Sequence, residues 1–104
     1  MSGEDSCRAD VWLWRALFFK TRSLSARFVE AGRVRLVRGA AQTRIDKASR
    51  ALRPGDGLVL ALGGRVIAVR VESLGERRGS AIEARRLYSE LPVSGPELTE
   101  ASIG

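Results

Sequence analysis

The residues best suited to chemistry in this sequence are basic and hydroxyl side chains that follow one another closely. Lys20, Thr21, Arg22 and Ser23 stand directly before a segment with helical spacing. The free N–H groups and the dipole at a helix N-terminus favour a phosphate, and an arginine adds a bidentate hydrogen-bonding fork. The run therefore predicts a phosphate clamp. The alternative is that Thr21 or Ser23 only caps the helix.

Several other arginines could extend this site. Arg27 follows one helical turn later, although it could instead pair with Glu30 at i,i+3. Asp10 is interpreted as a helix cap or as an ion-pair partner that orients Arg8, and not as a catalytic acid. The remaining candidates for contact with the same anion are Arg8, Arg15, Arg33 and Arg35.

No catalytic or metal-binding constellation accompanies these residues. Histidine is absent and Cys7 is the only cysteine, so a Cys/His zinc site and an intramolecular disulfide are excluded. The serines and threonines show no nucleophile elbow, and the glycines form no phosphate loop of the Walker or dinucleotide type. The sequence predicts a non-enzymatic protein without a metal or cofactor.

The charge distribution indicates what kind of partner to expect. The formal net charge is +6, yet residues 8–53 hold 12 basic and 3 acidic side chains, whereas the residues from 54 onward hold 6 basic and 7 acidic ones. Such a field favours phosphate backbones and speeds encounter with them. A membrane surface could use the same charge, and an arginine-rich composition could also reflect codon usage alone.

Length and hydropathy limit the architecture. The 104 residues fit one domain with a modest core. No stretch approaches the roughly 18 apolar residues of a membrane span, and the first residues lack the features of a secretory signal. We expect a monomeric cytoplasmic protein with no membrane partner. Its folded domain should cover residues 8–91, between disordered tails at 1–7 and 92–104.

The first half should form a helix-turn-helix pair. Asp10 stands where an N-cap belongs, and the apolar run after it predicts a helix to about Phe19. Thr21 or Ser23 can cap a second helix through Ala31, which Gly32 would end in a left-handed conformation. The aromatic residues of the first helix favour a core and a seat for the C-terminal helix over base stacking; they are Trp12, Trp14, Phe18 and Phe19.

The second half should form a small sheet followed by a helix. RVRLV after Gly32 alternates like a strand, RGAAQTR suits a loop or hairpin turn, and a short strand is expected near 43–45. Gly63-Gly64 predicts a tight hairpin between strands at 58–62 and 65–72. Ser80 and Glu83 form a capping box that should open a helix ending near Leu91-Pro92. Its apolar residues are Ile82, Leu87, Tyr88 and Leu91.

Together these segments resemble the S4 RNA-binding domain, because residues 8–60 contain motifs like those of that domain in the same order. The motifs are Arg8-x-Asp10, Thr21-Arg22-Ser23, the run A-R-F-V-E-A-G-R-V-R over 26–35, and Pro54-Gly55-Asp56. The D-x-W-L-W and F-K-T-R strings, with E-R-R-x-x-A-x-E-A-x-x-L-Y over 76–88, are similar to the stand-alone heat shock protein 15 family. That wider resemblance covers residues 8–91.

The resemblance implies an α+β fold: an αL motif of two helices packed on a small, mostly antiparallel sheet, with a C-terminal helix. It implies that the helix pair binds structured RNA, with ribosomal RNA of a stalled large ribosomal subunit as the partner. The family usually has V-N-G after the first strand, whereas Val37-Arg38-Gly39 stands here, so Arg38 joins the expected RNA-binding residues. The alternative function is a DNA-binding or protein-interaction adaptor that uses the same basic surface.

A second basic cluster lies near the C-terminus. It contains Arg77, Arg78, Arg85 and Arg86, interleaved with glutamates. Local neutralisation favours a solvated face there, with a secondary RNA contact as the alternative.

Overall fold

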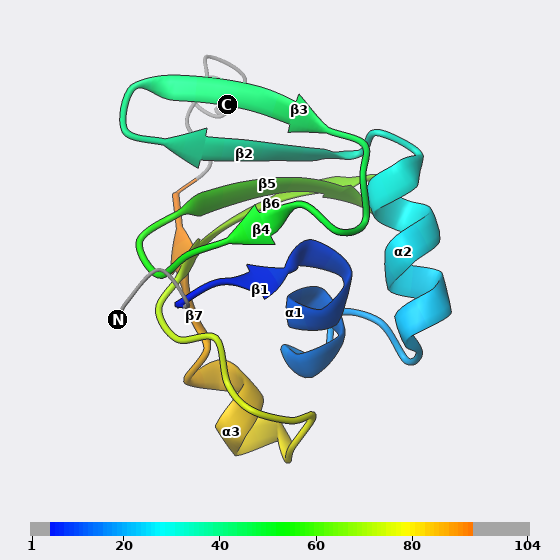
Figure 1. The fold of residues 1–104 in the computed structure, drawn as a ribbon, viewed down its shortest axis with the longest axis vertical. Helices are drawn as coiled ribbons and strands as arrows, with labels where there is room; N and C mark the ends of the chain where they lie inside the picture. Colours follow the sequence, from blue (N-terminus) through cyan, green and yellow to red (C-terminus); the bar gives the residue numbers. More distant parts are fainter. Residues whose placement is uncertain (1–4, 93–104) are drawn as a thin grey trace, which may run out of the picture.

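A computed structural model describes residues 5–92 of the chain (Figure 1). Of the tails expected at 1–7 and 92–104, residues 1–4 and 93–104 lie outside the described residues. The elements in chain order are β1 (Cys7–Arg8), α1 (Ala9–Arg15), α2 (Arg22–Glu30), β2 (Val34–Arg38), β3 (Ala41–Ile45), β4 (Ala51–Leu52), β5 (Gly57–Leu62), β6 (Arg65–Val71), α3 (Ala81–Arg85) and β7 (Tyr88–Leu91).

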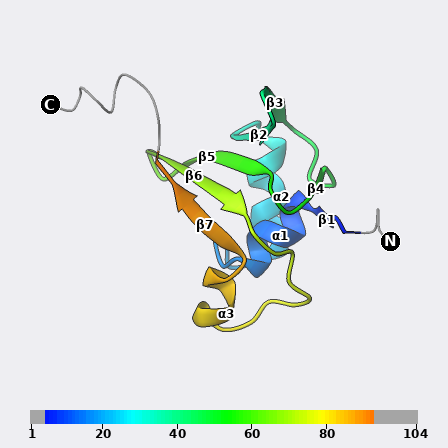
Figure 2. The ribbon, with the colours of Figure 1, turned by 90° about the vertical axis from the view of Figure 1, so that its left-hand side faces the viewer.

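The main sheet has five antiparallel strands in the order β3-β2-β5-β6-β7. Helices α1 and α2 and the small β1–β4 pair lie beside one face of this sheet, as Figures 1 and 2 show. The fold is therefore α+β, with the predicted αL helix pair on a mostly antiparallel sheet. Cys7, expected in a tail, instead pairs with Leu52 across β1 and β4.

The core lies between the helix pair and the sheet. Alternate residues of the central strands point inward, among them Leu36, Leu58 and Leu60, and meet the fully buried Trp12 and Leu13 of α1. Period-two alternation on the strands and helical spacing on α1 account for this layer. The prediction that Trp12 belongs to the core is confirmed.

The first helix ends earlier than expected. It stops at Arg15, and Leu17 takes a left-handed conformation with φ 66°. The Phe18 N–H then donates to the Leu13 carbonyl (3.1 Å) and the Leu17 N–H to the Trp14 carbonyl (3.1 Å), which is the hydrogen-bond pattern of a Schellman C-cap. This turn places the Phe18 ring against Tyr88, 5.0 Å between centroids. The prediction of a helix to Phe19 was wrong because the tertiary contact outweighs the helical periodicity.

The start of α1 also differs from the prediction. The N-cap is Arg8, whose side chain makes no capping bond, and Asp10 is already helical. The N–H groups of Ala9 and Asp10 donate to the carbonyls of Arg50 and Ala48 (2.8 and 3.1 Å), so a neighbouring loop satisfies the helix end. The Asp10 carboxylate accepts from the Val11 N–H (2.8 Å) and binds the Arg8 guanidinium, which confirms the ion-pair interpretation.

The predicted hairpins are present with small shifts. Gly63 and Gly64 both have positive φ (62° and 78°), as a tight turn between β5 and β6 requires. The loop expected over 38–44 is shorter, because β3 already begins at Ala41 and pairs with Arg38. The strand expected near 43–45 is therefore a longer one.

The C-terminal helix is the largest departure. The Ser80 hydroxyl accepts from the Glu83 N–H (3.2 Å) as predicted, but α3 ends at Arg85 and Tyr88–Leu91 forms β7 along β6. A helix to Leu91 would leave the backbone of β6 without a partner on this side. Sheet pairing therefore overrides the apparent helical stripe, and Ile82, expected on its apolar face, is 69% exposed.

Candidate nucleic-acid interface

The N-terminus of α2 carries the predicted clamp residues. Thr21 is the N-cap, since its hydroxyl oxygen accepts from the Leu24 N–H at 3.1 Å. Lys20, Arg22 and Ser23 are exposed around this cap. The N–H groups of Arg22 and Ser23 belong to the first helical turn and have no intrahelical acceptor, so they remain available to an anion.

Buried contacts fix the direction in which this helix end points. The Ser25 hydroxyl, fully buried, donates to the Asp10 carbonyl at 2.8 Å and joins α2 to α1. Phe19 packs on Phe28, 4.9 Å between ring centroids, at the connection between the two helices. The clamp therefore stands on a rigid support and not on a free loop.

Arg27 extends the charge along the outer side of α2. Its side chain is exposed, and it forms no ion pair with Glu30 or with any other residue between 5 and 92. Glu30 is the single acidic residue of α2. The alternative in which Glu30 neutralises Arg27 is thus not the arrangement adopted here.

Arginines also gather where α2 leads into β2. Arg33 is exposed directly after Gly32, whose φ of 77° ends the helix as predicted. The Arg44 side chain from β3 packs beside Gly32, where an added Cβ would stand 3.6 Å from the Arg44 Cδ. Positive charge near a helix C-terminus is favourable for the helix, so Arg44 serves the fold whether or not it meets a ligand.

Arg78 joins the clamp from a distant part of the chain. Its Nε donates to the Trp14 carbonyl (3.2 Å) and its Nη2 to the Phe19 carbonyl (3.4 Å). The guanidinium carbon lies 5.8 Å from the Trp14 ring centroid, within cation–π range. No local sequence pattern predicts this position of Arg78, because only the fold brings it beside the connection that leads to Lys20.

We call Lys20, Arg22, Arg27 and Arg78 the basic helix surface. No member forms an ion pair with a carboxylate of residues 5–92. Guanidinium and ammonium groups without a carboxylate partner, beside free helix N–H groups, attract phosphate.

Two other predicted contact residues are engaged within the protein. Arg15 is half-buried, and its Nη1 donates to the carbonyls of Leu74 and Gly75 (3.2 and 2.9 Å). Arg8 donates a bidentate pair of hydrogen bonds to Asp10 (3.0 and 3.1 Å), and its hydrogen bonding to this carboxylate raises the pKa of Arg8. Arg15 therefore ties a loop to α1, while Arg8 remains exposed beside its partner.

Arg38 also has an internal partner. Its Nε and Nη2 donate to the two carboxylate oxygens of Asp56 at 2.9 and 2.7 Å. Burial of Asp56 would raise the pKa of this carboxyl, but hydrogen bonds from Arg38 and from the Arg53 N–H outweigh it and lower the pKa. The Asp of the Pro54-Gly55-Asp56 turn thus anchors the end of β2.

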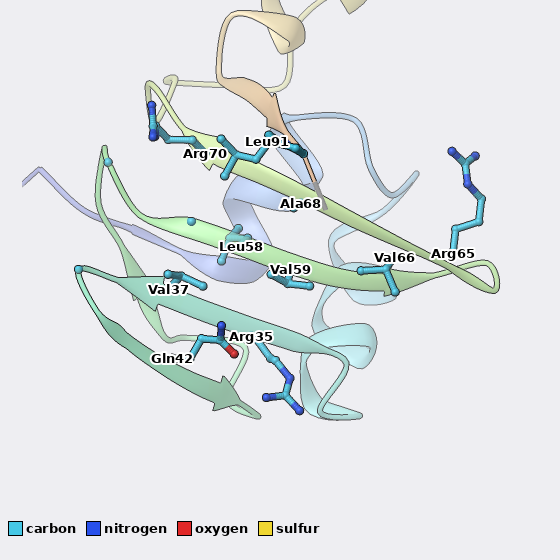
Figure 3. Close-up of a pocket in the computed structure, with 14 residues that line it drawn as sticks. Arg35, Val37, Gln42, Leu58, Val59, Arg65, Val66, Ala68, Arg70 and Leu91 are labelled. Carbon is cyan, nitrogen blue, oxygen red and sulfur yellow. The ribbon is translucent and has the colours of Figure 1, made fainter. Parts of the chain in front are cut away.

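Arg35 points elsewhere. It lies on β2 beside the half-buried Val37, on the sheet face that turns away from the helix pair, as Figure 3 shows. The candidate residues are therefore distributed over two faces of the molecule.

The aromatic residues of the first helical segment serve mainly in packing. The Trp12 indole N–H donates to the Ser73 carbonyl (2.8 Å), and Phe18 and Tyr88 surround its ring. Trp14 is half-buried under Arg78. The seat predicted for a C-terminal helix is instead occupied by Tyr88 of β7.

Within residues 5–92, no group of His, Cys, Asp or Glu side chains is placed to hold a metal ion. None of the helices described is long and apolar enough to cross a membrane.

Comparison with known proteins decides the family. Residues 7–36 match the S4 domain. The chain is 35% identical over 95 residues to the heat shock protein 15 homolog of Aeromonas salmonicida, covering 91% of this chain and 68% of that protein. It superposes on the trimeric structure of Vibrio cholerae heat shock protein 15 with a TM-score of 0.72 and 35% identity, covering 83% and 82% of the two chains.

The chain belongs to the heat shock protein 15 family. The homolog from Haemophilus influenzae is 34% identical over 87 residues, which cover 84% of this chain and 63% of that protein, so the chain spans less than two thirds of that relative. An S4 domain in a heat shock protein 15 family member supports RNA binding. The S4 match covers β1, α1, α2 and most of β2. Three residues of the basic helix surface lie within this matched segment: Lys20, Arg22 and Arg27.

Proposed function

We propose that this heat shock protein 15 family member binds structured ribosomal RNA on the large ribosomal subunit, without catalysing a reaction, during rescue or recycling of stalled subunits. The observation that carries this proposal is the basic helix surface: four cations without a carboxylate partner among residues 5–92, gathered at a rigid S4-type helix pair and its connection. This surface supplies phosphate contacts in a fixed geometry, as recognition of RNA shape requires. The ribosomal and rescue roles rest on the family resemblance.

The proposed contact residues differ in how free their side chains are to contact RNA. The basic helix surface, together with Thr21, Ser23 and Arg33, is exposed and available to RNA. Arg8 and Arg38 keep exposed edges but already bind carboxylates, and Arg15 binds backbone carbonyls. We therefore propose that the first group makes the main contacts and that Arg15 and Arg38 act chiefly on the fold.

Sedimentation of a cell lysate on a density gradient tests the partner. Co-migration with free large subunits at low salt, and release as salt rises, is expected. A position at the top of the gradient under all salt conditions would contradict the proposal and favour the adaptor alternative.

The proposal includes a cytoplasmic location and a monomeric state. The Vibrio cholerae relative has a trimeric structure, so sedimentation equilibrium of this chain is the direct test of the second expectation. A mass that exceeds that of one chain and is independent of RNA would contradict it.

A further inference from the structure

The sheet face that turns away from α1 and α2 carries a shallow hollow of about 920 Å³. Figure 3 shows it from outside, with Val37, Val59 and Val66 between arginines at its margins. Val66 is 53% exposed and adds apolar surface to this patch. This surface is separate from the basic helix surface.

The register of the sheet builds the hollow from two cross-strand rows. One row runs through Arg35, Val59, Ala68 and Leu91. The next runs through Val37, Gly57, Arg70 and Ser89. Each row places apolar or small side chains beside an arginine. Gly57 leaves the centre of the hollow open, because a Cβ added there would fill space and stand only 3.3 Å from the Val37 Cβ.

The arginines at the margins have no charged partner within the part of the chain that the structure describes. Arg35, Arg65 and Arg70 line the hollow, and no acidic residue between 5 and 92 lines it. None of the three pairs with a carboxylate of residues 5–92. This contrasts with Arg38, which lies at the end of the same strand as Arg35 and binds Asp56.

We propose that this face is a docking surface for an extended peptide segment of a partner protein, in which the side chains that face the sheet include both acidic and apolar residues. Carboxylates would meet the guanidinium forks, and apolar side chains would cover the valines and Leu91. Because successive side chains of an extended chain point to opposite sides, only every second residue of the segment faces the sheet, and both kinds of side chain must occur among these residues.

RNA is the less suitable occupant. Among the described residues, no Phe, Tyr or Trp side chain lines the hollow, so unpaired bases would find no aromatic surface there on which to stack. A phosphate backbone would leave its valines without an apolar partner. The mixed chemistry of the face therefore favours a peptide.

The size of the sheet sets the length of the segment. Five strands spaced about 4.8 Å apart span about 19 Å between the outer two, and an extended chain rises about 3.3 Å per residue. A segment of about six to eight residues would therefore cross the face.

The test uses the full chain and a synthetic peptide of about eight residues with the repeat Glu-Ser-Leu-Ser, which places Glu and Leu on the same side of an extended chain. Fluorescence anisotropy and backbone-amide NMR shifts are the readouts. The control peptide has the repeat Lys-Ser-Leu-Ser. We expect the acidic peptide alone to bind and to shift the amides of Val59 and Arg70. Arg35→Glu/Arg70→Glu should weaken this binding at least about tenfold. Val66→Ser, which leaves the charges unchanged, should weaken it too.

The matched control is Arg85→Glu/Arg86→Glu, which changes the net charge equally but lies outside the hollow. It should leave peptide binding intact, and circular dichroism reports whether each variant folds. If the Arg35→Glu/Arg70→Glu variant does not fold, peptide binding by Val66→Ser and the amide shifts of the unmodified chain still show whether the peptide occupies this face.

Four results would overturn the proposal. One is equal binding of the two peptides or binding of neither. Another is loss of RNA affinity in Arg35→Glu/Arg70→Glu beyond that in the control variant, which would assign the face to nucleic acid. A third is self-association that Val66→Ser abolishes, which would make a second copy the occupant. The last is peptide binding seen only after deletion of residues 93–104, which would assign the face to the chain's own segment with Glu97 and Glu100.

Discussion

Replacement of Arg38 by alanine should destabilise the fold more than replacement of an ordinary surface arginine. Asp56 is 4% exposed and would keep only the Arg53 N–H as a donor, at 2.8 Å. Hydrogen bonds to charged groups contribute about 1.5–3 kcal/mol, and breaking a buried pair costs about 3–5 kcal/mol. Because the Arg38 side chain is 40% exposed, water replaces part of the lost partner, and we expect a loss of about 2 kcal/mol.

The pH dependence of stability provides a second, independent test of the Arg38–Asp56 ion pair. The folded-state pKa of Asp56 is lowered, so its ion pair stabilises the fold above the ordinary Asp pKa, about 3.9, and that contribution is lost as pH falls through the lower folded-state pKa. Without Arg38, burial should raise the pKa of this carboxyl instead. The stability gap between the unmodified chain and Arg38→Ala should therefore be largest near neutral pH and shrink below about pH 4.

Urea unfolding followed by circular dichroism at several pH values measures both effects, and thermal unfolding should show a midpoint about 10 °C lower for Arg38→Ala at neutral pH. The matched control is Arg35→Ala on the same strand, which should change the free energy of unfolding by less than about 0.5 kcal/mol. Equal stabilities of the two variants, or a gap that is the same at neutral and acid pH, would refute this reasoning.

Three further predictions concern RNA binding. Raising salt from about 50 to 200 mM should weaken RNA binding by orders of magnitude through counterion release, and a flat titration would contradict phosphate contact. A structured or looped RNA should bind better than duplex DNA of equal length in a filter-binding assay, and equal affinities would favour the adaptor alternative. Arg78→Ala should weaken RNA binding severalfold more than Arg86→Ala, because only Arg78 is held at the α1–α2 connection. The reverse order in the same assay would exclude Arg78 from the basic helix surface.

The sequence predicted the features that depend on local chemistry. Thr21 caps α2, Gly32 ends it, and Gly63-Gly64 turns the β5–β6 hairpin, each because few other residues suit that backbone position. The α+β class and the helix pair followed from apolar periodicity together with the family resemblance.

Features set by long-range contacts could not be predicted in the same way. Leu17 adopts a left-handed conformation that glycine or asparagine usually takes, so nothing local marks the early end of α1. Tyr88–Leu91 reads equally well as helix or strand, and the open side of β6 decides between them. Likewise, Arg38 resembles any exposed basic residue until Asp56 is seen beside it.

The most direct test of the account is the RNA affinity of two matched double variants. Arg22→Ala/Arg27→Ala removes two cations of the basic helix surface, and Arg85→Ala/Arg86→Ala removes two exposed arginines from the end of α3 and the residue after it. The first should raise the dissociation constant at least about tenfold and lower the salt slope by about 2, with a nearly unchanged thermal midpoint. The second should have a much smaller effect. Loss of RNA binding in Arg85→Ala/Arg86→Ala with full binding in Arg22→Ala/Arg27→Ala would contradict the central claim that the α2 N-terminus binds RNA.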